Sequence, residues 1–186
     1  MGRRPVYINW GLSSFYGWGV YGLNLALNWL SDPDLAPVAT NPIEPRALSL
    51  DPLRLRALED LRQRSAAFQD RLAAFAAGPA TLDAVVLADF NAQFQRSRAA
   101  HEVIVSGQPT VAVTFFETAR LEPQAVSRAG DYPLIVAGST WNRDVLHAHG
   151  LSQARTVLQG VDPTLFHPAP SIGYLPDRFL VFSGGK

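Results

Sequence analysis

Three stretches of the chain are continuously apolar, and they set its overall pattern. They read "DAVVLA" from Asp83, "TVAVTFF" from Thr110 and "LIVAG" from Leu134. Continuous apolar runs of this length are typical of strands covered on both faces in a parallel sheet. A dozen or more residues separate the runs, as parallel crossovers require. Shorter runs predict three further strands: residues 6–10, "APVAT", which Pro37 marks as weak or edge-like, and "ARTVLQG".

Apolar residues at helical spacing fill the stretches between these strands. Residues 20–30 follow a glycine- and serine-rich loop and are spaced as in a helix. The clearest helix has Asp51 as its cap and runs until Gly78 and Pro79 stop it. Its apolar positions are Leu58, Leu61, Phe68, Leu72 and Phe75. Another helix is capped by Ser139 or Thr140 and stops at Gly150. This alternation predicts an α/β fold with a Rossmann-like doubly wound parallel sheet.

Length and composition predict the domain boundaries of the chain and the kinds of partner it can bind. We expect residues 1–158 to form one domain and residues 159–177, which include four prolines, to be a linker. Sixteen basic residues balance sixteen acidic ones, so no net field recruits nucleic acid. No stretch approaches the roughly 20 apolar residues that span a bilayer. The lack of cysteine fits a reducing compartment, and we expect a cytoplasmic protein.

The glycine-rich stretch "GLSSFYGWGVYG" is the first candidate site. Gly17, Gly19 and Gly22 match G-x-G-x-x-G, a pattern that brings backbone amides to a phosphate at a helix N-terminus. A dinucleotide site also needs an acid about 20 residues further on, where this chain has Thr40 and Asn41. Two other interpretations stay open: a turn that permits close helix packing, and a ligand-binding loop at a strand's carboxyl end.

Two more candidates follow apolar strands. Glu117 in "TFFETAR" could orient a hydroxyl or accept a proton, or it could cap a turn or pair with Arg120. Ser139, Thr140 and Asn142 in "GSTWNRD" offer polar groups, although capping alone explains one or two of them. His147 and His149 point in different directions on a helix and make a poor metal pair. Asp32-Pro33-Asp34 is more typical of a turn than of a metal site.

A family resemblance joins these candidates. Residues 133–168 resemble the segment that closes the N-terminal domain of GT-B fold glycosyltransferases of the GT4 type. The matching residues are Ser139, Trp141, Asn142, Arg143, Gly150, Leu151, Gly160, Val161, Asp162, Phe166 and Pro168. Gly17-Trp18-Gly19 is similar to the family's first glycine-rich loop, and Phe116-Glu117-Thr118 is similar to its central acceptor-site strand end. Residues 40–108 contribute only a general pattern.

The resemblance implies a two-domain fold in which one domain binds the acceptor and the other binds the donor. The chain would be the acceptor-side half of a GT-B architecture, and "RFLVFSGGK" at residues 178–186 would be the first strand and loop of a donor-binding domain, with Gly184 and Gly185 near the donor phosphates. Most contacts to the nucleotide sugar would come from that second domain. A simpler alternative is that residues 179–182 add a strand to the first sheet.

The resemblance also implies an activity. We expect transfer of a sugar from a nucleotide-sugar donor to a hydroxyl on a carbohydrate, lipid-linked or other acceptor, with retention of configuration, no metal and no other cofactor. Glu117 would be the catalytic residue, and Gly17, Trp18, Gly19, Thr118, Ser139, Trp141, Asn142 and Arg143 would bind donor or acceptor. Many relatives have histidine where this chain has Glu117, and others have glutamate. An ionised carboxylate cannot donate a hydrogen bond, which favours acceptor orientation over donor contact as the role of Glu117.

Two other functions stay open: an NAD(P)-binding oxidoreductase domain and a non-catalytic module that binds a phospho-ligand. A peripheral contact with a membrane also stays open. We expect residues 1–186 alone to fold but not to transfer sugar, since the donor contacts would be missing.

Overall fold

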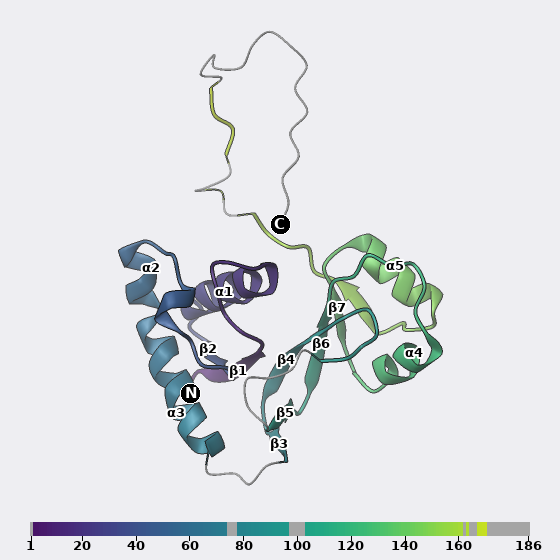
Figure 1. Ribbon diagram of the computed structural model, residues 1–186, viewed down its shortest axis with the longest axis horizontal. Coiled ribbons are helices and arrows are strands. Elements are labelled where there is room, and N and C mark those ends of the chain that lie inside the picture. Colours follow the sequence, from purple (N-terminus) through teal and green to yellow (C-terminus); the bar gives the residue numbers. More distant parts are fainter. Residues whose placement is uncertain (1, 74–77, 97–102, 162, 164–166, 171–186) are drawn as a thin grey trace.

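A computed structural model describes residues 2–73, 78–96, 103–161, 163 and 167–170. Its main sheet has six strands in the order β2-β1-β4-β6-β7-β8, and every pairing is parallel (Figure 1). The strands are β1 (Arg4–Asn9), β2 (Leu35–Ala39), β4 (Val85–Phe90), β6 (Thr110–Thr114), β7 (Ile135–Ala137) and β8 (Ala154–Thr156). The parallel α/β sheet predicted from the apolar runs is therefore confirmed.

Helices pack on both faces of this sheet. The helices are α1 (Gly17–Leu30), α2 (Pro52–Ala57), α3 (Glu59–Ala73), α4 (Pro123–Gly130) and α5 (Thr140–Ala148), and residues Pro45–Ala47 form a 3-10 turn. The apolar side of α1 meets Ile8 and Val113 in one cluster. Residues of α4 and α5 meet Ala88 and Ala112 in a second cluster, on the opposite face. This arrangement is that of a doubly wound fold.

A third apolar cluster lies where α3 crosses the sheet. Phe68 and Leu72 of α3 pack against Tyr7, Val38 and Val86, and the rings of Tyr7 and Phe68 are 5.0 Å apart. Every third or fourth residue of α3 is buried, as the helical spacing predicts. The expected helix from Asp51 is divided at Leu58 into α2 and α3, and Asp51 caps it as predicted by accepting from the N–H groups of Leu53 and Arg54.

Two strands of the fold have no counterpart in the predicted set. β3 (Pro79–Leu82) and β5 (Ile104–Gly107) pair in parallel to form a separate two-stranded sheet. β2, which contains Pro37, lies at the edge of the main sheet, as its proline predicts. After β8, the described residues 157–161, 163 and 167–170 form no helix or strand.

The topology defines one edge of the sheet for ligands. β1 has β2 on one side and β4 on the other, so the direction of winding changes between β1 and β4. In open α/β sheets, ligands bind outside the carboxyl ends of the strands at such a switch point. The chain that leaves β8 rises from this same edge, beside α1 (Figure 1). Among the described helices, none is long and apolar enough to cross a membrane.

Candidate functional site

The loops that follow β1, β6 and β7 all emerge at the carboxyl edge of the main sheet, because its strands are parallel. These loops carry the glycine-rich stretch, Glu117 with Thr118, and Ser139 at the start of α5. The fold therefore brings the three candidate segments to one edge. Gly184 and Gly185 lie outside the described residues.

The glycine-rich stretch is the start of a helix rather than a free loop. Gly17 is the first residue of α1, and no side chain caps this helix at Tyr16. The first N–H groups of a helix have no partner inside it, so the amides of this turn are oriented for an anion. A Cβ added to Gly17 would meet no atom within 4 Å. The backbone at Gly17 is therefore accessible.

Gly19 has a packing role. A Cβ added there would lie 2.7 Å from the Ser13 Cβ and 2.8 Å from the Ser13 nitrogen. The Ser13 hydroxyl in turn donates to the Ala47 carbonyl at 3.2 Å, which ties this loop to the 3-10 turn. The close-packing interpretation of this glycine thus has direct geometric support, and it leaves the amides of Gly17 and Trp18 as the open part of the turn.

Trp18 belongs to an aromatic cluster beside a large cleft. Its ring lies 4.7 Å from Phe115 and 5.4 Å from Trp10, and its carbonyl accepts from the Trp10 indole at 3.0 Å. Tyr21 meets Phe115 edge to face at 5.2 Å. A cleft of about 1040 Å³ lies between α1 and residues 157–161, and Trp18, Tyr21 and Phe115 are among its lining residues. Its size is that of a small-molecule site.

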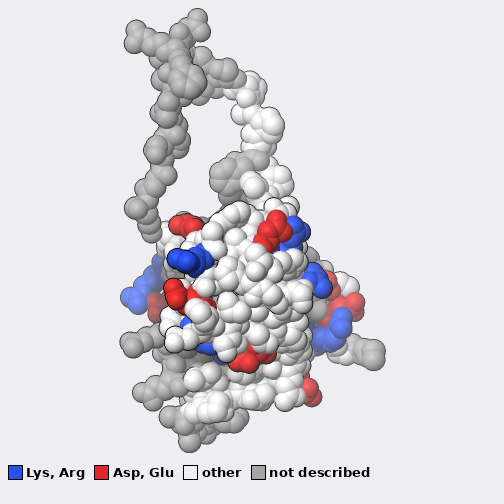
Figure 2. Space-filling model, turned by 90° about the vertical axis from the view of Figure 1, so that its right-hand side faces the viewer, with Lys and Arg blue, Asp and Glu red and all other residues white. Residues whose placement is uncertain are grey.

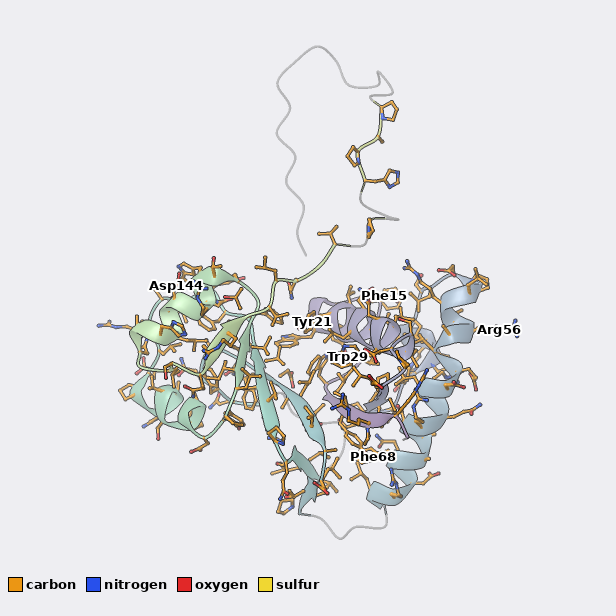
Figure 3. The ribbon with its side chains drawn as sticks, turned by 180° about the vertical axis from the view of Figure 1, so that it is seen from behind. Phe15, Tyr21, Trp29, Arg56, Phe68 and Asp144 are labelled. Carbon is orange, nitrogen blue, oxygen red and sulfur yellow. The ribbon has the colours of Figure 1, made fainter. Side chains whose placement is uncertain are left out.

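The position of Gly138 explains how Phe115 reaches this cluster. A Cβ on Gly138 would overlap the Phe115 ring, so only glycine allows β7 and the chain after β6 to approach this closely. Figure 3 shows Tyr21 projecting from α1 toward the middle of the sheet, whereas Phe15 lies on the other side of α1. The aromatic floor of the cleft therefore depends on two loops and one helix.

Glu117 is exposed on the loop that follows β6. The expected strand ends at Thr114, two residues before Phe116. Within the described chain, the Glu117 carboxylate has no ion pair or hydrogen bond, and Glu122, not Glu117, stands at the N-cap of α4. Thr118 instead closes the turn, because its hydroxyl donates to the Arg120 carbonyl at 3.2 Å. The Glu117 carboxylate is thus free to accept a hydrogen bond from a ligand.

Ser139 and Asn142 are engaged in holding α5. The Ser139 hydroxyl accepts from the Asn142 N–H at 3.0 Å, which makes Ser139 the N-cap. The buried Asn142 amide donates to the Phe116 carbonyl at 2.7 Å. This bond fixes α5 to the residue before Glu117. Capping therefore accounts for Ser139, and Asn142 positions the loop that carries the candidate carboxylate.

Trp141 and Arg143 face outward from the first turn of α5. The Trp141 ring is 45% exposed and lies 5.9 Å from Phe116. The Arg143 guanidinium pairs with its neighbour Asp144 at 2.6 Å. Both signs of charge are interspersed over the face that carries α4 and α5 (Figure 2).

Large apolar side chains are exposed along the carboxyl edge. Phe15, Tyr16 and Val20 belong to the start of α1, Trp141 to the start of α5, and Val157, Leu158 and Val161 to the chain after β8. An exposed apolar edge of this kind is typical of a binding surface.

The sequence patterns did not reveal Asp89. It is 4% exposed on β4, next to the switch point, and alternation along the strand puts it on the same face as Leu87. The Tyr16 side chain is partly exposed, but the partial burial of its hydroxyl, and then the negative charge of Asp89, raise the pKa of that hydroxyl. A Cβ on Gly11 would overlap this same hydroxyl. Asp89 directly follows the apolar run "DAVVLA", but β4 continues through it to Phe90, so this carboxylate lies within the strand and not in the loop after it, where the other candidates lie.

The two weak metal candidates have structural roles. His147 and His149 approach the carbonyls of Ala154 and Val145 at 3.1 and 2.8 Å. The Asp32 carboxylate accepts from the Asp34 N–H at 2.8 Å, which closes a turn. Among the residues described, no cluster of three or more histidine, cysteine or acidic side chains could hold a metal.

Comparison with protein-family models, with curated proteins and with solved structures found no match to this chain.

Proposed function

We propose that this chain is the acceptor-side domain of a GT-B type, nucleotide-sugar-dependent glycosyltransferase. The observation that carries the proposal is the convergence of the glycine-rich stretch, Glu117 and the start of α5 on one edge of a parallel sheet. These are the three segments on which the sequence resemblance rests. A cleft with an aromatic floor opens beside the glycine-rich stretch, with Gly17, Trp18 and Phe115 among its lining residues.

In this proposal Glu117 orients the acceptor. An exposed carboxylate without a protein partner accepts a hydrogen bond from a hydroxyl, which points the oxygen lone pair at the sugar carbon it attacks. Asn142 positions this loop through its bond to the Phe116 carbonyl. Catalysis then depends on holding acceptor and donor together while charge develops on the leaving phosphate.

The amides at the start of α1 are suited to that phosphate. The uncapped first turn presents N–H groups at the positive end of the helix. Most donor contacts would come from a second domain, and the reaction would be retaining, metal-independent and cytoplasmic. The exposed apolar edge formed by Phe15, Trp141 and Leu158 fits a surface that a second domain covers.

The dinucleotide alternative has less support. Gly19 is committed to packing on Ser13, and the end of β2 offers Thr40, which is buried and bonded to Asn9 at 2.6 Å. Neither Thr40 nor Asn41 supplies the acid that binds a nucleotide ribose. Competitive binding of UDP-glucose, GDP-mannose and NADPH to the natural gene product separates the two functions. Preference for NADPH would refute the glycosyltransferase proposal, and preference for a nucleotide sugar would support it.

A further inference from the structure

Helix α1 is unusually apolar for a helix with an exposed side. Residues 5–31 contain no charged side chain, and α1 carries leucine, valine or an aromatic residue on most of its circumference. A helix that is apolar all round is normally buried. Here Val20, Asn24 and Asn28 are exposed, and they line the cleft of about 1040 Å³. The uncovered side of α1 is therefore a wall of this cleft.

The wall carries two amides one helical turn apart. The side-chain N–H groups of Asn24 and Asn28 donate to the carbonyls of Val20 and Asn24 at 2.9 and 2.8 Å. Their amide oxygens accept no hydrogen bond from another described residue, so both remain available as acceptors. Gln159 supplies a third amide from the opposite side of the cleft. The aromatic rings of Trp18, Tyr21 and Phe115 line the same cleft.

The described lining of the cleft is almost without charge. Among the described residues that line it, Arg54 is the one charged side chain, and it lies 3.4 Å from the Asp51 carboxylate. A ligand with several charges would lose its hydration without finding counter-charges. An alkyl chain would cover the amides of Asn24 and Asn28 without replacing their hydrogen bonds to water. A neutral ligand that combines apolar C–H faces with many hydroxyl donors satisfies both kinds of surface.

We infer that this cleft binds a neutral oligosaccharide, with sugar rings against Trp18, Tyr21 and Phe115 and hydroxyls donating to Asn24 and Asn28. The 14 residues of α1 span about 21 Å, enough for an extended ligand rather than a single small group. This inference rests on the proposed function in one respect: it identifies the acceptor as a glycan that lies along α1 with its reactive end toward Glu117.

The test is glycan binding by the 186-residue chain. A labelled preparation is applied to an array of immobilised neutral and acidic glycans, and the strongest neutral ligand is then titrated calorimetrically. We expect binding to neutral glycans. Replacement of both amides, Asn24→Ala with Asn28→Ala, should weaken binding at least about tenfold, since two hydrogen bonds are lost. Val20→Lys, which changes a different residue of the same wall, should weaken it as well.

Matched measurements keep the outcome clear. Gln63→Ala removes an exposed amide from α3, outside the cleft, and should bind as the unchanged chain does. Circular dichroism establishes that each variant is folded. No binding to any neutral glycan would overturn the inference, and so would binding to acidic glycans alone. Binding of decanol that the double alanine variant leaves unchanged, without glycan binding, would overturn it in favour of an alkyl ligand.

The inference and the proposed function can fail separately. Glycan binding that depends on Asn24 and Asn28, in a protein that transfers no sugar, would support the glycan site and refute the glycosyltransferase activity. Sugar transfer to an acceptor that is not a glycan, at a rate that the double alanine substitution does not change, would support the glycosyltransferase activity and refute the glycan site.

Discussion

At the scale of single residues, two kinds of side chain lie at the carboxyl edge of the sheet: some hold the structure together, and others are free to contact a ligand. Ser139 and Asn142 are bonded to backbone, and Gly19 makes room for Ser13. Glu117 is exposed without a partner in the described chain. Only the free groups are suited to contact a substrate directly, and this distinction decides what each substitution should do.

Glu117→Gln tests the proposed acceptor contact. The substitution keeps the shape of the side chain and removes its charge, and we expect sugar transfer by the natural gene product to fall at least about tenfold. The melting temperature should not change, because Glu117 makes no contact that its loss would break. Wild-type kinetics with a lowered melting temperature would show instead that Glu117 is a structural residue.

Gly17 and Gly19 should respond differently to alanine. At Gly19 the new Cβ would approach Ser13 to within 2.7 Å, and overpacking of this kind costs about 1–3 kcal/mol of stability. At Gly17 the Cβ meets open space, so the folding free energy should be nearly unchanged. Urea denaturation of both variants measures the difference. Equal stabilities would show that the first turn of α1 does not pack on Ser13 in this way.

Alkaline pH should destabilise the fold through its tyrosines. Burial raises the pKa of Tyr21, and burial together with Asp89 raises that of Tyr16. The folded state therefore holds these protons more tightly than the unfolded state, whose tyrosines titrate near the ordinary value of 10.0. The contribution of these two tyrosines to the free energy of unfolding should be constant below that value and fall as the pH rises through the higher folded values. Urea titrations should show a smaller decline for Tyr21→Phe, and an identical decline would contradict this cause.

At the scale of elements, long apolar runs could be predicted and short strands could not. β4, β6 and β7 were recognisable because burial on both faces makes them continuously apolar. β3 and β5 have exposed positions such as Pro79 and Ile104, and each is four residues long, so neither shows a distinct pattern. α4 is eight residues long with buried Ala125 and Ala129, which gives too little apolar spacing for a prediction.

Ser139 and Thr140 test the cap of α5. The sequence allowed either residue as the cap, and the structure assigns the role to Ser139, whose hydroxyl accepts from the Asn142 N–H. Ser139→Ala should lower the free energy of unfolding by about 1 kcal/mol. Thr140→Ala changes an exposed side chain next to it and should cost much less. Chemical denaturation distinguishes the two, and an equal loss would mean that the cap is not specific to Ser139.

The candidate site was predictable in its location and only partly in its members. Parallel strands bring the loops after them to one edge, so Glu117, Ser139 and the glycine-rich stretch could be expected there. Tyr21, Phe115 and Asp89 could not, because their roles depend on which side chains meet across α1, β4 and β6. Such contacts are set by packing between elements rather than by local sequence.

At the scale of the whole molecule, the proposed function requires a catalytic cleft shared between this domain and a second one. The chain that leaves β8 contributes to both the exposed apolar edge and the cleft, since Val157, Leu158 and Val161 belong to each. Residues 1–186 bury their own apolar clusters and should fold without help. Without preorganised contacts to the donor, this chain alone should bind nucleotide sugars weakly.

The most direct test is a radiochemical assay of sugar transfer from nucleotide sugars, run on the natural gene product and on residues 1–186 side by side. We expect transfer by the natural gene product, and none by residues 1–186 even though they are folded by circular dichroism. Steady turnover by residues 1–186 would show that the active site is not shared with a second domain. Absence of transfer from every nucleotide sugar by the natural gene product would contradict the proposed function itself.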